Sequence, residues 1–391
     1  MTLPLSNIRV LEFSHAVLGP AAGLHLAEFG AEVIRIERTP DGDPTRRLPG
    51  FGQGYHTMFN RNKKSLVVDL KREEGQAIVH KLLATADILI ENFGPGTMER
   101  LGLGYEALHG RYPRLIYCAL KGFMPGPYEK RTALDEVVQM MSGLAYMTGR
   151  PGDPLRAGAS IIDIMTGVYG AMGCLLALQE REKTGRGQLV KSALFETAAF
   201  IMGHHMAYAA ITQEPVPPMP ARVSAWAIYQ QFETADGGRI FVGVTSDQQW
   251  ARFCREFERP DWLTDERLQS NNGRIAQRDW FLPEVEALMA GLPQSDIVTR
   301  CEAANLPFSP IARPEDLFDD PQLNQGGSLQ EITLPDGRIK KLPHLPLRLD
   351  QFPAAVRQQP PPPGHHTRQL LHELGYGEAE IDALAADGIV V

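Results

Sequence analysis

The sequence predicts an α/β protein with a mostly parallel sheet in a large domain, followed by a smaller α+β domain. Three observations lead to this prediction. Short β-branched apolar runs alternate with helical patterns in the first half, which is typical of βαβ units. A proline-rich stretch, TQEPVPPMPARVS (212–224), interrupts the chain near its middle. The length of 391 residues exceeds what one hydrophobic core usually serves.

The elements of the first half follow from this alternation. The expected strands are IRVLEFS (8–14), EVIRIE (32–37), SLVVDL (65–70), DILIEN (87–92) and LIYCAL (115–120). The expected helices cover 20–29, 72–84, 97–108 and 134–147, and a longer one runs from about Asp163 to Arg181. After the turn TGRGQ (184–188), the segment LVKSALFETAAFIMGHHMAYAA has a largely helical periodicity.

The second half divides at its proline-rich stretches. ADGGRIFVGV (235–244) predicts a turn and strand, QQWARFCREF (248–257) an amphipathic helix, and ITLPDGRIKKL (332–342) a further strand and turn. We therefore expect a large domain over 1–211, a linker over 212–224 and a small α+β domain over 225–325. Residues 326–391 form a return segment with C-terminal helices, which should pack on the large domain.

Composition excludes several classes of function. The net charge is −8 and basic residues are scattered, which argues against a nucleic-acid partner. Four separated cysteines without a CxxC pair, and no HExxH motif, predict neither a structural zinc nor any other metal site. No signal peptide and no apolar run long enough for a bilayer are recognised. The expectation is a cytoplasmic protein without a membrane partner.

Phosphate-binding signals are weak when each is taken alone. The loop SHAVLGPAAG (14–23) follows a strand, where α/β proteins bind ligands, yet it lacks the G-x-G-x-x-G of a dinucleotide site. Basic residues recur after predicted strands, namely Arg38, Lys71 and Arg100. They could surround a phosphorylated nucleotide, or each could be an ordinary solvated surface charge.

A lone carboxylate, Asp163, precedes the long apolar helix in LRAGASIIDIMTGVYG. Ser160 stands three residues earlier, so a capping pair at the helix N-terminus is one interpretation. Nucleophilic catalysis is the other, because a carboxylate is ionised at neutral pH without a base and can attack an activated acyl group such as a thioester. Local spacing alone does not separate these two interpretations.

Several longer segments together resemble the class III CoA-transferases, a family that also contains α-methylacyl-CoA racemases. They are LEFSHAVLGPAAGLHLAEFGAEVIRIER, NKKSLVVDLKREEG, ADILIENFGPGTMERLGLGY, AGASIIDIMTGVYGAMGCLLALQEREKTGRGQ and GHHTRQLLHELGY. Their order and spacing, over nearly the whole chain, carry the resemblance. It implies a Rossmann-like large domain and two chains interlocked into a homodimer.

The resemblance also implies the site residues and the chemistry. Asp163 matches the family's nucleophile, and the CoA-binding positions are matched by His15, Val17, Arg38, Val68, Lys71, Asn92, Phe93 and Arg100. The implied reaction moves CoA from an acyl-CoA to a carboxylic acid, small or dicarboxylic, through aspartyl anhydride and aspartyl-CoA thioester intermediates. The CoA thioester is then a substrate, and no permanently bound cofactor is expected.

Departures from the family pattern bear on specificity. The segment VGVTSDQQW (242–250) has one glycine where formyl-CoA transferases have a glycine-rich loop, and Ala133 stands near a CoA-contacting lysine. Leu134 precedes Asp135 where racemases have a histidine, so one of the two proton-transfer groups of a racemase is missing. A 2-methylacyl-CoA racemase or epimerase, and a non-catalytic acyl-CoA-binding protein, are the alternatives. Arg222, at the linker, is a candidate for a distal carboxylate or a surface residue.

Overall fold

The computed structural model describes residues 2–222, 224–353 and 355–391. It divides into two compact units. The first comprises the chain up to Ala221 together with Pro321–Val391, and the second is Arg222–Asp320. The chain therefore leaves the first unit and later returns to it.

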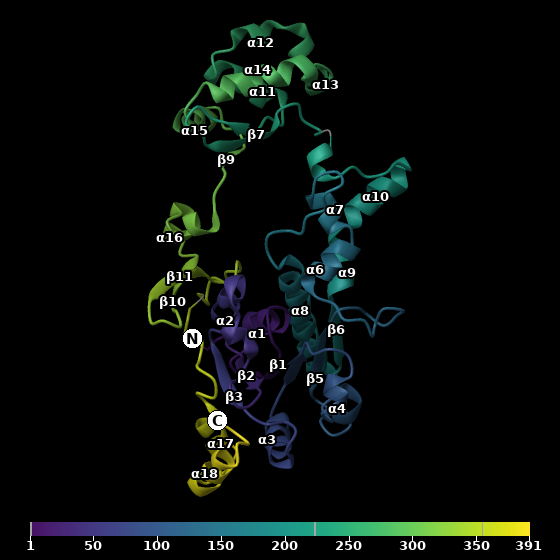
Figure 1. The fold of residues 1–391 in the computed structure, drawn as a ribbon, viewed down its shortest axis with the longest axis vertical. Helices are drawn as coiled ribbons and strands as arrows, with labels where there is room; N and C mark the ends of the chain where they lie inside the picture. Colours follow the sequence, from purple (N-terminus) through teal and green to yellow (C-terminus); the bar gives the residue numbers. More distant parts are fainter. Residues whose placement is uncertain (1, 223, 354) are drawn as a thin grey trace. The chain divides into compact units, whose positions relative to one another are not determined.

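A six-stranded parallel sheet forms the centre of the first unit, in the order β3-β2-β1-β4-β5-β6 (Figure 1). The strands are β1 (Arg9–Phe13), β2 (Glu32–Glu37), β3 (Lys63–Val67), β4 (Ile88–Glu91), β5 (Ile116–Lys121) and β6 (Leu189–Ala193). This order is that of a doubly wound sheet, in which the direction of winding reverses between β1 and β4. The α/β class expected from the sequence is confirmed.

Two layers of apolar side chains cover the sheet. On one face, α1 (Leu18–Glu28) and α8 (Ile161–Thr184) lie side by side and pack on Val10, Ile90 and Cys118 (Figure 1). The other face carries α3 (Glu73–Leu83), and the C-terminal helices α17 (Thr367–Glu373) and α18 (Glu378–Ala386) contribute to the same core. The remaining helices of this unit are α2 (Gln53–Phe59), α4 (Thr97–Arg100), α5 (Tyr105–Leu108), α6 (Asp135–Met141), α7 (Leu144–Thr148), α9 (Leu194–Ile201), α10 (Gly203–Thr212) and α16 (Pro321–Gln325).

The second unit is built on a three-stranded antiparallel sheet, β7-β8-β9, with its own core around Trp250, Phe253 and Phe281. Its elements are β7 (Tyr229–Glu233), β8 (Arg239–Gly243), α11 (Asp247–Glu256), α12 (Pro260–Thr264), α13 (Asn271–Ala276), α14 (Arg278–Ala290), α15 (Gln294–Ala303) and β9 (Phe308–Pro310). The hairpin β10 (Leu329–Thr333) and β11 (Ile339–Pro343) follows on the return segment.

Three features differ from the sequence-based expectations. The segment 189–193, expected to be helical, is the edge strand β6. The predicted helix 97–108 is divided into α4 and α5 by Gly102, and 134–147 is divided into α6 and α7 by Gly143. Both glycines have positive φ, of 71° and 85°, which ends a right-handed helix.

Helix α8 is a further correction, because the sequence was expected to hold no apolar run long enough for a bilayer. In the described part of the chain, α8 has the length and composition that would permit membrane crossing. Its buried residues, however, pack against α1 and strands β5 and β6, as in the core helix of a globular protein.

Candidate active site

The loops that follow β1 and β4 flank the point where the sheet reverses its winding, which is where doubly wound proteins bind ligands. Four of the predicted site residues lie here. The ring of His15 stacks on Phe93, with centroids 5.8 Å apart. Asn92 joins the two loops, since its side chain accepts a hydrogen bond from the His15 amide (3.1 Å) and donates one to the His15 carbonyl (3.0 Å). Val17 is buried at the start of α1.

Asp163 lies in the first turn of α8 at the same edge of the sheet. Because β6 is parallel to β5 and directly follows α8, the helix must run from the carboxyl edge of the strands back to the amino edge. Gly167, one turn after Asp163, packs closely on the first turns of α1. A Cβ added there would lie 3.0 Å from the Leu18 carbonyl and 3.1 Å from the Ala22 nitrogen. The structure thus brings the start of α8 towards the start of α1.

The helix N-terminus at Asp163 is capped from another helix. Ser160 makes no side-chain capping bond, so the local capping interpretation is wrong. The carboxylate of Asp135, on α6, instead accepts hydrogen bonds from the amides of Ile162 (2.8 Å) and Asp163 (3.0 Å). The side chain of Asp163 therefore remains available for chemistry.

The environment of Asp163 raises its pKa to about 7. Burial is the largest cause, because it disfavours the charged form, and the neighbouring charge of Asp135 adds to it. Arg156 acts in the opposite direction; its guanidinium lies 3.6 Å from both Asp135 and Glu136. Half-buried carboxyl groups with a pKa near neutrality are found preferentially at active sites.

The predicted basic residues fall into different places. Lys71 and Arg100 line one groove of about 650 Å³, which also includes Arg72, a residue that the sequence reasoning did not single out. Arg38 is exposed directly after β2. Val68 is fully buried and pairs with Val390 in an isolated bridge, so its side chain belongs to the core.

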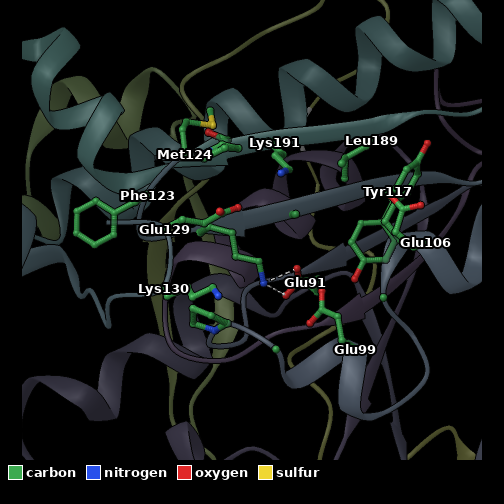
Figure 2. Close-up of a pocket in the computed structure, with 18 of the residues that line it drawn as sticks. Glu91, Glu99, Glu106, Tyr117, Phe123, Met124, Glu129, Lys130, Leu189 and Lys191 are labelled. Atoms are coloured by element: carbon green, nitrogen blue, oxygen red, sulfur yellow. Dashed lines mark hydrogen bonds and ion pairs between the residues drawn. The ribbon is translucent and has the colours of Figure 1, made fainter. Parts of the chain in front are cut away.

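A separate cavity of about 540 Å³ lies on the face of the sheet opposite α8. Figure 2 shows residues that line it. Tyr117, Leu189 and Lys121 are among its lining residues, and Lys121 donates to Glu91 (2.7 Å) and to the Phe93 carbonyl (2.9 Å). Asp163 is not among its lining residues. This cavity is therefore distinct from the candidate active site.

Among the described residues, no group of three or more His, Cys, Asp or Glu side chains could hold a metal ion. All four cysteines are buried and free. Asp135 and Arg156 are the residues around Asp163 whose roles sequence reasoning missed. Both act through contacts distant in sequence, and the only available signal was that Asp135 aligns with an aspartate of the related racemases.

Comparison with known proteins places this geometry in a family. The profile described as CoA-transferase family III matches residues 5–367. The chain is 34% identical over 384 residues to a succinate–glutarate CoA-transferase of Agrobacterium fabrum, covering 95% of this chain and 96% of that one. It is also 34% identical over 382 residues to the alpha subunit of a succinyl-CoA–L-malate CoA-transferase of Chloroflexus aurantiacus, covering 95% and 89%.

Solved structures agree with the sequence comparison. The crystal structure of a CAIB/BAIF family protein from Brucella suis superposes with a TM-score of 0.85 at 29% identity, covering 96% of this chain and 100% of that one. The chain belongs to CoA-transferase family III. It is a class III CoA-transferase, and the family's substrates are CoA thioesters.

Proposed function

We propose that this enzyme moves CoA from an acyl-CoA donor to a small or dicarboxylic acid, with Asp163 as the nucleophile. The observation that carries the proposal is the position of Asp163: a half-buried carboxyl group with a pKa of about 7, at the same sheet edge as the two loops of the switch point. The dicarboxylate class is supported by the relatives named for glutarate and L-malate.

The reaction proceeds through four acyl-transfer steps. The first two attach CoA to Asp163, and the last two transfer it to the acceptor acid. The Asp163 carboxylate attacks the donor carbonyl, the C–S bond of the tetrahedral intermediate breaks, and CoA leaves as a thiolate, so that an acyl-aspartyl anhydride is formed. The thiolate attacks the aspartyl carbonyl and expels the donor acid, leaving an aspartyl-CoA thioester. The acceptor carboxylate attacks this thioester and forms a second anhydride, and the returning thiolate then releases acceptor-CoA and free Asp163.

Two sets of groups in the first unit suit the negative charges of the intermediates and of CoA. Val17 provides no side-chain cap for α1, so the first N–H groups of that helix are available at this edge. Such groups are suitable donors for the oxyanion of each tetrahedral intermediate. Lys71 and Arg100 supply positive charge for the phosphates of CoA in the groove they share.

The proposed assembly is the interlocked homodimer. Large apolar side chains are exposed on neighbouring helices of the first unit: Met172, Leu175 and Leu176 on α8, Phe200 on α9, and Met206, Tyr208 and Ile211 on α10. Exposed apolar side chains gathered on neighbouring helices often mark a protein–protein interface, and a second copy of the chain is the partner we propose. Leu176, which is 59% exposed, gives the test. Leu176→Glu should lower the mass measured by light scattering, and an unchanged mass would contradict the proposed interface.

Intact-protein mass spectrometry with peptide mapping tests the chemistry. The protein is mixed with succinyl-CoA and other acyl-CoAs, with and without a panel of carboxylic acids. An acyl or CoA adduct on the Asp163 peptide, discharged by one acid, is expected, and Asp163→Ala should form none. Deuterium incorporation at the α-carbon of a 2-methylacyl-CoA without any acid would instead establish an epimerase. Binding of CoA without adduct or turnover would establish the non-catalytic alternative.

A further inference from the structure

The β1–α1 loop, residues 14–17, is held by side chains from other parts of the fold. Asn92, after β4, bonds both the amide and the carbonyl of His15. Thr45 accepts a hydrogen bond from the amide of Ala16 through its Oγ1, at 3.1 Å. Consecutive main-chain groups of this loop therefore depend on partners that are 29 and 77 residues away in sequence.

Ala16 is the residue that most needs such support. Its φ of 59° lies in the left-handed region, which a residue with a Cβ adopts only at an energetic cost. The following turn adds a second restriction. A Cβ on Gly19 would lie 2.3 Å from the Ser14 Cβ and 3.2 Å from the Asn92 Cγ, so the loop is packed tightly between α1 and the loop after β4.

Thr45 is oriented by a buried group of charges. Its hydroxyl donates to Asp43 (2.6 Å). Because the hydroxyl hydrogen points to Asp43, a lone pair of the Thr45 Oγ1 is left to accept the hydrogen bond from the Ala16 amide. Asp43 accepts a hydrogen bond from Arg35 (2.6 Å), and Arg35 also donates to the Ser14 carbonyl (3.3 Å). The Arg35 side chain is only 1% exposed. The charge group therefore reaches the loop at two points, through Thr45 and through Arg35.

Burying such charges is expensive, and buried ion pairs are often no more stabilising than apolar residues of the same size. Their geometric consequence is specific, however, because they fix one backbone conformation beside the start of α8. We infer that Thr45 and Asn92 are positioning residues, which hold the β1–α1 loop so that a bound CoA thioester meets Asp163. This inference rests on the proposed function.

The inference changes the role expected of Asn92. The resemblance made Asn92 a CoA-binding residue, but its amide oxygen and one N–H of its amide nitrogen bond the main chain of His15. Asn92 then serves CoA through the loop rather than by a bond of its own. Thr45 was not among the predicted site residues; it is 4% exposed and its hydroxyl bonds both Asp43 and Ala16, so changing it removes hydrogen bonds within the protein.

The test compares Thr45→Val with Thr45→Ser. Valine keeps the shape and removes the hydroxyl, whereas serine keeps the hydroxyl. The rate at which an acyl-CoA acylates Asp163 is measured in single turnovers by quench and mass spectrometry, with steady-state kcat and KM alongside. For Thr45→Val we expect acylation and kcat to fall about 10- to 100-fold, because small misplacements have effects of this size, with KM changed less than about 3-fold. Thr45→Ser should stay within about 3-fold of wild type.

A double-variant cycle separates positioning from ligand binding. If Asn92 and Thr45 hold the same loop, Asn92→Ala combined with Thr45→Val should lose much less than the product of the two single losses. A full product would show that Asn92 acts independently, as a direct CoA ligand would, and would overturn its assignment as a positioning residue.

The remaining outcomes are also decisive. If Thr45→Val only lowers the melting temperature and acylates Asp163 at the wild-type rate when folded, the inference is wrong and the proposed function stands. If the wild type itself forms no adduct on Asp163, the proposed function fails, and the inference that depends on it fails too.

Discussion

Replacing Asp163 by asparagine should stabilise the folded protein, increasingly so as the pH rises. The folded-state pKa of Asp163 is about 7, against an ordinary value of 3.8. The fold therefore favours the protonated form. The free-energy cost of holding the ionised carboxylate in the folded protein is absent below the ordinary pKa. It appears as the pH rises above that value and is complete above the folded-state pKa.

The size of the effect follows from that pKa difference. Each unit corresponds to 1.36 kcal/mol, so a shift of about three units gives a cost of about 4 kcal/mol at pH 8. By linkage the cost is about 2 kcal/mol at pH 5.5 and below about 1 kcal/mol at pH 4. Asparagine carries no charge, so Asp163→Asn removes this cost at every pH.

The assay is chemical denaturation of wild type and Asp163→Asn at pH 4, 5.5 and 8, at one protein concentration. The difference in free energy of unfolding between them should grow with pH. Asp41→Asn is the matched control, because it makes the same substitution at a side chain that is 69% exposed. A difference that stays constant from pH 4 to pH 8 would refute the reasoning, since it would mean that Asp163 titrates alike in the folded and unfolded chains.

Three further predictions use other parts of the site. Asp135→Asn removes the like charge beside Asp163, so the pKa of Asp163 should fall and the acid limb of single-turnover acylation should move to lower pH; an unmoved limb would exclude this coupling. Arg100→Ala should raise the KM for acyl-CoA about 10-fold at low salt and less at high salt, whereas the control Lys183→Ala, in the last turn of α8, should leave it unchanged. Equal effects of the two variants would argue against CoA binding in the groove that Arg100 lines. Gly23→Ala should destabilise the fold by about 3–5 kcal/mol, because its Cβ would lie 1.7 Å from a buried Glu12 oxygen, whereas denaturant unfolding of Gly54→Ala, with open space around it, should show little change.

The sheet could largely be predicted from the sequence because its strands are buried β-branched runs separated by helical patterns. Strand β2, for example, covers Glu32–Glu37 as expected. Strand β6 was missed because Leu189–Ala193 leads without a break into α9, so its short apolar run merges with a helical pattern. The divisions at Gly102 and Gly143 depend on a single backbone angle each, and a periodic pattern does not register them.

The site was less accessible to sequence reasoning than the fold. Asp163 stood out because it precedes a long apolar helix, but the same pattern suited a capping box, and only the three-dimensional position of Asp135 removes that interpretation. The role of Thr45 could not be predicted from the sequence for a similar reason. A threonine after Asp-Pro is an ordinary turn residue until the fold brings it to the amide of Ala16.

Reactivity and stability oppose each other at Asp163, and both have the same physical origin. A carboxylate of higher pKa is the better nucleophile towards a thioester, but at neutral pH a group with a pKa of about 7 is only about half ionised. Burial and Asp135 produce that pKa, and by linkage they also make the ionised group costly to fold. Arg156 partly offsets both effects. Removing it with Arg156→Ala should raise the pKa of Asp163 further, so that acylation falls at pH 6 while recovering towards the wild-type rate at pH 9. A loss of equal size at both pH values would show that Arg156 acts on the site by some means other than charge.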